Sequence, residues 1–201
     1  MKKVNLVTVL FFSSLTTLAQ SASGAIEKKF NLGFNIGLHY SDLREAEALP
    51  ANASISNNLG FRLGFLANYK VSSMLSLSPK AEISFNNSKV NLGDTQEAYE
   101  IPTNLELMTH VVLQNENMKL NPYFFFGPNV KIPAADNTTT YSANTDVAID
   151  FGFGIMKAFS KLNFSPELRY SYGLRDISRY ASVGSLNYNH IALVFNFLGV
   201  K

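Results

Sequence analysis

Residues 147–174, VAIDFGFGIMKAFSKLNFSPELRYSYGL, carry the pattern from which the fold of this chain is predicted. Large apolar residues occupy every second position, first from Val147 to Ile155 and again from Leu162 to Leu174. A period of two indicates β-strands, because successive side chains leave a strand on opposite faces. Both runs are longer than the usual strand of about five or six residues. A long strand with one apolar face and one small or polar face is typical of a membrane barrel.

The same alternation recurs along the rest of the chain, so that eight strands are expected in all. The other six are Phe30–Tyr40, Leu59–Tyr69, Leu75–Asn86, Ile101–Leu113, Leu120–Val130 and His190–Phe197. Short connections (Val71–Met74, Asn115–Met118 and Ser160–Lys161) alternate with long polar ones (Ser41–Ser56, Asn87–Glu100, Lys131–Thr145 and Asp176–Leu186). This pattern predicts an all-β fold, an eight-stranded antiparallel up-and-down transmembrane β-barrel in a bacterial outer membrane. Both termini are expected at the short-turn, periplasmic rim.

Alternation alone does not say which face is inside, and a soluble lipocalin-like barrel would have the opposite polarity. The apolar register holds six or seven large residues per strand, which is too bulky for one small lumen. The other register is rich in glycine and charge, which suits a tight polar interior. We therefore expect Phe34, Phe65, Phe153 and Leu168 to face outward, and Arg62, Glu106 and Arg169 to face inward.

The first residues of the chain read as a secretory signal. Lys2 and Lys3 precede a mostly apolar stretch from Val4 to Leu18, and small residues follow. We expect a signal peptide over residues 1–19, with cleavage near residues 19–25, and one barrel domain over 26–201. An uncleaved anchor is the alternative, although the stretch is shorter and more polar than the roughly 20 apolar residues that span a bilayer.

Composition excludes several other classes of protein. The chain has no cysteine, which rules out disulfides and thiolate metal sites. Its 17 basic and 15 acidic residues form no basic run, so nucleic acid is not expected as a partner. Aromatic residues gather near both ends of the strands and predict two interfacial girdles. These are Tyr40, Phe85, Tyr99, Tyr172 and Tyr188 at the loop ends, and Phe30, Tyr69, Phe159, Phe164 and Phe197 at the turn ends.

Several short motifs give the chain a resemblance to the PorT-like family of outer-membrane β-barrel proteins. They are Tyr99–Pro102, Asn121–Tyr123 with Phe126–Pro128, Asp150–Gly152 with Gly154, and above all Pro166–Leu174. The resemblance implies an eight-stranded barrel in the outer membrane of a bacterium with a two-membrane envelope. Most members have no assigned activity, and the namesake is implicated in the type nine protein secretion and gliding system.

The inward register gathers ionisable side chains that must pair in a narrow barrel, since an unpaired buried charge costs several kcal/mol. We expect Glu167 and Arg169 to join Asp150 across their hairpin. A salt-bridged plug is favoured over a translocation path, because eight strands enclose an interior just wide enough for side chains. The predicted interior network is Arg62, Lys80, Glu82, Glu106, His110, Asp150, Glu167, Arg169 and His190, with His39 in the same register.

His39 and Ser41 are weak candidates for catalysis. They share a face at the outer rim, with Glu45 and Glu47 in the following loop, and some lipid A deacylases use a His/Ser/Glu set on a small barrel. Such catalysis requires the histidine within hydrogen-bond reach of the hydroxyl. His39 and His190 are also expected on neighbouring strands, where two imidazoles could bind a transition metal, but no third ligand is evident. Polar lining is the preferred interpretation of both histidines.

These patterns favour a small non-enzymatic barrel with a filled interior and a structural, adhesion or secretion-accessory role. Outer-membrane lipid is the expected partner, with other envelope or secretion-system proteins as further candidates, and no cofactor is expected. The alternatives are a lipid-modifying outer-membrane enzyme, a small pore for solutes and a soluble periplasmic ligand-binding barrel.

Overall fold

Long antiparallel strands make up most of the chain in the computed structural model, which describes residues 30–45, 53–92, 97–101, 103–115, 120–134, 144–178 and 185–199. The predicted signal peptide lies outside these residues. In chain order the strands are β1 (Phe30–Glu45), β2 (Ala53–Ser56), β3 (Leu59–Lys70), β4 (Leu75–Phe85), β5 (Lys89–Leu92), β6 (Glu97–Glu100), β7 (Asn104–Gln114), β8 (Pro122–Pro133), β9 (Asp146–Ile155), β10 (Lys157–Ala158), β11 (Leu162–Gly173) and β12 (Leu186–Gly199).

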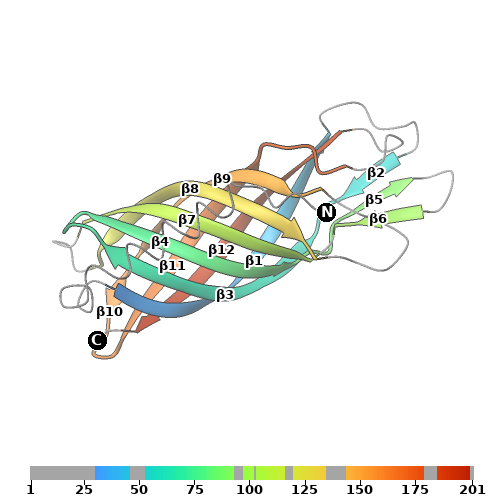
Figure 1. Ribbon diagram of the computed structural model, residues 1–201. Helices are drawn as coiled ribbons and strands as arrows, with labels where there is room; N and C mark the ends of the chain where they lie inside the picture. The colour runs from blue at the N-terminus through green and yellow to red at the C-terminus, as the bar shows by residue number, and fades with distance from the viewer. Residues whose placement is uncertain are drawn as a thin grey trace, which may run out of the picture.

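The main sheet closes on itself as an up-and-down barrel (Figure 1). Its order is β10-β11-β12-β1-β3-β4-β7-β8-β9, and β9 also pairs with β11. Since β10 continues β9 after Met156, we count β9 and β10 as one strand, so that the nine labelled strands make up eight strands of the barrel wall. Every neighbouring pair is antiparallel, and the predicted eight-stranded barrel is confirmed.

The two faces of the wall have the polarity predicted for a membrane protein. Phe34, Phe65, Phe153 and Leu168 are 50%, 75%, 53% and 36% exposed on the outside. Arg62, Glu106 and Arg169 are fully buried in the lumen. This is the reverse of a soluble ligand-binding barrel, in which the apolar residues line the interior.

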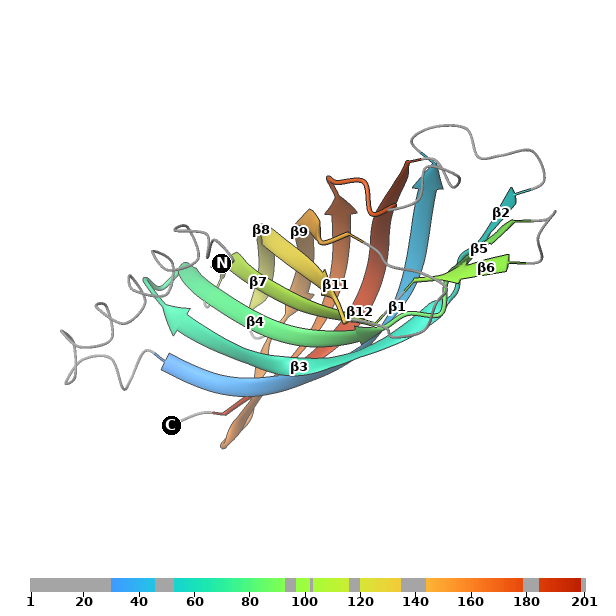
Figure 2. The same cartoon turned by 45° about the vertical axis from the view of Figure 1, so that its right-hand side comes forward.

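The two rims of the barrel differ. The turn that follows β3 and the turn between β10 and β11 lie at one rim, where β1 begins at Phe30 and β12 ends at Gly199. We call this the turn rim. At the opposite loop rim, β2, β5 and β6 form a separate three-stranded sheet that projects beyond the barrel (Figure 2).

The structure corrects the predicted boundaries of the long loops. β1 continues to Glu45, β8 reaches Pro133, and β12 already begins at Leu186. The extension of β1 carries the polar outward side chains Asp42 and Arg44, and that of β12 carries Asn187, whereas Ile132 in the extension of β8 is apolar. In β1 and β12 the apolar alternation therefore stops before the strand itself does.

Small residues in the lumen make room for larger neighbours, as the pattern predicts. A side chain at Gly60 would overlap the His39 imidazole, and a Cβ at Gly64 would lie 2.7 Å from the Cγ of Glu82. Gly152 lies against the Phe125 ring, and a Cβ added at Gly152 would lie 2.6 Å from Cζ of Phe125. Glycine at these positions lets bulky side chains, polar and aromatic, fill a narrow barrel.

The predicted aromatic residues lie on the outer face at both ends of the barrel, but the prediction is wrong for Tyr188. Tyr40 and Tyr172 face outward at the loop end, and Phe30 and Phe159 do so at the turn end. Tyr188 points inward instead and is buried, because β12 enters the barrel in the register of His190. The side chain of Tyr99 lies outside the described residues. No helix within the described ranges has the length and apolar character needed to cross a bilayer.

Candidate functional site in the barrel interior

An arginine-carboxylate cluster fills the middle of the lumen. Arg169 donates to both carboxylate oxygens of Glu82, at 2.9 and 3.0 Å, and to Oε1 of Glu167, at 2.8 and 3.0 Å. Arg62 donates to Glu82 at 3.0 Å and to Glu106 at 3.3 Å. The paired side chains come from four different strands of the barrel wall, and all are almost completely buried. The cluster therefore ties opposite walls together across the barrel.

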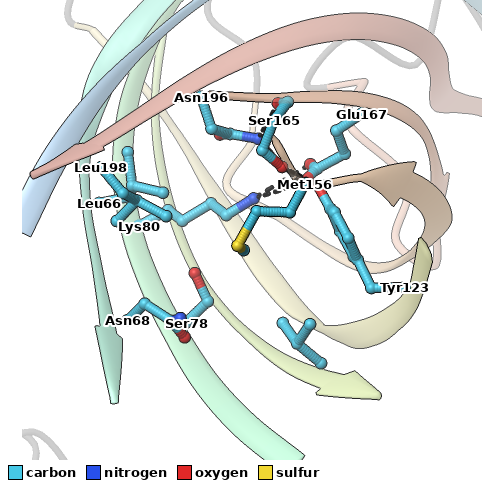
Figure 3. A pocket seen from close by; sticks show the side chains of 11 residues that line it. Leu66, Asn68, Ser78, Lys80, Tyr123, Met156, Ser165, Glu167, Asn196 and Leu198 are labelled. Carbon is cyan, nitrogen blue, oxygen red and sulfur yellow. Dashed lines mark hydrogen bonds and ion pairs between the residues drawn. The ribbon is translucent and has the colours of Figure 1, made fainter. Parts of the chain in front are cut away.

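The Lys80–Glu167 ion pair forms the floor of a pocket toward the turn rim (Figure 3). Lys80 Nζ contacts the two carboxylate oxygens of Glu167 at 3.0 and 2.9 Å. Tyr123 and Asn196 also donate to this carboxylate. The pocket has a volume of about 20 Å³. This is enough for a water molecule and too small for a solute to pass.

A second polar group supplies the direct contacts of Asp150, while Arg169 interacts with it only electrostatically. Asp150 contacts Nε2 of His110 at 3.1 Å and accepts from Asn129 at 3.2 Å. The register explains the difference, because Asp150 pairs with Ser171 in β11, whereas Arg169 pairs with Gly152. Arg169 therefore lies two rungs away from Asp150 along its strand.

Lys131 and Asp146 form an ion pair near the loop rim that the sequence pattern does not predict, because Lys131 falls in an expected loop. Their side chains are 3.2 Å apart and almost completely buried, and Lys131 Nζ also donates to the Tyr188 carbonyl at 3.0 Å. The signal was present, because Lys131 continues the inward register of Asn129, and Asp146 continues that of Asp150. The two residues are direct partners in the β8–β9 ladder.

An apolar cap covers the polar interior at the loop rim. Val90 and Ile101 from the connection between β4 and β7 pack with Ile177 from the connection between β11 and β12. Leu43, Leu186 and Tyr188 complete this buried cluster, and Ile55 of β2 packs against it. The apolar cap thus joins the projecting sheet to the end of the barrel.

The structure does not bring His39 and Ser41 together as a catalytic pair. Both side chains are buried inside the barrel. Nε2 of His39 contacts Asn86 Oδ1 at 2.8 Å, and the Ser41 hydroxyl contacts Tyr188 OH at 3.3 Å. Nδ1 of His39 has no partner in the described part of the chain. Glu45 is exposed at the end of β1, and Glu47 lies outside the described residues.

His39 and His190 lie side by side, with ring centroids 5.5 Å apart. Nε2 of His190 lies 2.9 Å from Arg62 and must accept this hydrogen bond, because a guanidinium only donates. The lone pair of this nitrogen is therefore not available to a metal ion. Over the described ranges, no group of three histidine, cysteine or acidic side chains could hold a metal ion.

The comparison with protein families agrees with the closed barrel and its polarity. The model for "Outer membrane protein beta-barrel domain" matches residues 18–179, which is most of the chain. The chain belongs to this family. For this outer-membrane barrel, no curated protein gives a significant match.

Among the solved structures similar to this outer-membrane barrel, the first one below shows the same fold. Neisserial surface protein A (NspA) is 11% identical with a TM-score of 0.58, and the match covers 85% of this chain and 97% of that one. Ail of Yersinia pestis, solved with the heparin analogue sucrose octasulfate, is 12% identical with a TM-score of 0.47, covering 85% and 99%. OprG of Pseudomonas aeruginosa is 14% identical with a TM-score of 0.46, covering 85% and 91%.

Proposed function

We propose that this chain is a non-enzymatic outer-membrane barrel with a sealed interior, whose exposed loop rim carries a structural or envelope-accessory role. The observation that carries the proposal is the buried cluster around Arg62, Glu82 and Arg169. Its ion pairs cross the lumen at 2.9–3.3 Å, which supports an interior filled by side chains. Buried charges fix a unique register in some proteins, and that is the role proposed for this cluster.

The placement of the chain in the envelope is part of the proposal. Residues 1–19 would direct the chain across the inner membrane, and the turn rim, with both ends of the barrel, would face the periplasm. The short connections at that rim support this orientation, because outer-membrane barrels have short periplasmic turns and longer external loops.

Planar-bilayer recording tests the sealed interior. The purified full-length barrel is expected to show no steady conductance, because paired side chains cross the lumen and the pocket toward the turn rim has room for a water molecule. A steady large conductance in most insertions would contradict the proposal and favour a solute pore. Heat-dependent gel mobility of the same sample confirms that the inserted protein is folded.

Lipid A from cells that express the chain tests the enzymatic alternative. Ser41→Ala is expected to leave the lipid A profile identical to that of the wild type, because the Ser41 hydroxyl is buried and bonded to Tyr188 rather than to His39. Mass spectrometry of the extracted lipid measures this. A deacylated product that appears with the wild type and disappears in the variant would establish a lipid-modifying enzyme.

The finer kinship to the PorT-like family also remains a proposal, supported by the motif Pro166–Leu174. Three residues of this motif build the interior, since Glu167, Arg169 and Ser171 all point inward. A secretion-accessory role predicts that removing the gene reduces the export of type nine cargo. Unchanged export would restrict the protein to a structural or adhesive role.

A further inference from the structure

The outward face of β1 continues above the aromatic girdle with two charged residues. Tyr40, Asp42 and Arg44 follow one another on the outer face of the strand, and the Asp42 and Arg44 side chains are 40% and 56% exposed. Tyr40 belongs to the girdle that marks the edge of the hydrocarbon layer. Arg44 lies four residues further along β1, which places it at the depth expected for the lipid head groups.

The Arg44 guanidinium reaches sideways across β12 toward β11. Its Nη2 donates to the hydroxyl of Tyr170 at 3.4 Å, and Tyr172 lies within electrostatic reach. The contact with Asp42 is made by Nε at 3.1 Å. Among the described residues, the edge formed by Nη1 and Nη2 has no carboxylate partner.

A second exposed arginine, Arg175, follows the end of β11 near Arg44. Asn187 of β12 pairs with Arg44 on one side and forms a bridge with Asp176 on the other, so the backbone at Arg175 lies near the same place. The resulting surface combines the Arg44 guanidinium and the hydroxyls of Tyr170 and Tyr172 with the exposed residues Arg175 and Asp176 close by. We call it the Arg44 patch.

We propose that the Arg44 patch binds a phosphate group of lipid A, the phosphorylated glycolipid of the outer leaflet. A guanidinium matches phosphate oxygens with two parallel hydrogen bonds, and the Tyr170 hydroxyl adds a further donor. The Asp42 carboxylate repels the same phosphate and so limits the affinity. The inference rests on the proposed orientation, in which the loop rim faces outward.

Titration of the purified, folded barrel in detergent micelles with lipid A tests the proposal, with thermal stability at each lipid concentration as the readout. Arg44→Gln is expected to weaken binding about tenfold, since it removes the positive charge and its hydrogen bonds to the phosphate oxygens. Asp42→Asn is expected to tighten binding, because it removes the repelling charge. A purely structural role for the Asp42–Arg44 pair would give both variants the same sign.

The matched control is Lys161→Gln, which removes one positive charge at the turn rim and is expected to leave lipid A affinity unchanged. Equal affinities of Arg44→Gln and Lys161→Gln would overturn the site. Lipid A without phosphate is expected to bind at least tenfold more weakly than lipid A. If phosphatidylglycerol binds as tightly as lipid A, the commitment to lipid A is wrong. Failure of this titration leaves the sealed interior intact, since conductance tests that separately.

Discussion

Replacing Arg169 by methionine is expected to lower the free energy of unfolding by about 3–5 kcal/mol. Methionine keeps an unbranched chain of similar length but removes every contact to Glu82 and Glu167. The two carboxylates then remain buried with fewer cations. Urea unfolding of the barrel in lipid vesicles, followed by the heat-dependent shift on a gel, measures the loss.

Two further variants separate lost charge pairing from disturbed packing. Leu168→Met, the outward neighbour of Arg169 on β11, is expected to cost less than about 1.5 kcal/mol. The double variant Arg169→Met/Glu82→Gln removes one charge of each sign and is expected to be more stable than Arg169→Met alone. A loss for Arg169→Met no larger than that for Leu168→Met would show that the arginine does not hold the interior together.

A charge placed on the lipid face should be the second large effect. Phe151→Arg is expected to destabilise the inserted barrel by about 2–4 kcal/mol, the usual cost of arginine near the bilayer midplane. Phe151 lies halfway along β9 on its outward face, beside Phe126 and Tyr170. The measurement is again reversible urea unfolding in vesicles, combined with the fraction of protein that inserts.

Phe159→Arg is the matched control, since Phe159 is similarly exposed but lies at the turn rim. Arginine near the interface costs only about 0–1 kcal/mol. Equal losses for the two variants would mean that the barrel wall does not meet hydrocarbon at Phe151, contrary to the membrane orientation described here.

The architecture could be predicted from the sequence because the alternating pattern encodes it locally. A run such as Val147, Ile149 and Phe151 identifies a strand and its lipid-facing side without any knowledge of its neighbours. The inward position of Arg62, Glu82 and Arg169 follows from the same parity. Such a prediction fails where the outward residues become polar, as at Asp42 and Arg44, because the pattern there predicts a loop although β1 continues.

The pairings inside the barrel could not be predicted, because they depend on how far each strand is shifted against the next. Lys80 on β4 and Glu167 on β11 lie on strands that are not neighbours, and their side chains meet across the lumen. A shift of one strand by two residues would keep every side chain on its own face but would change every partner. The actual register of the strands therefore determines that the Asp150 carboxylate contacts the His110 ring.

The apolar cap gives the two ends of the ionic interior different surroundings. Toward the turn rim, the pocket beside Lys80 has room for a water molecule, whereas Val90, Ile101 and Ile177 pack together at the loop rim. We therefore expect water and protons to reach the interior mainly from the compartment that the turn rim faces.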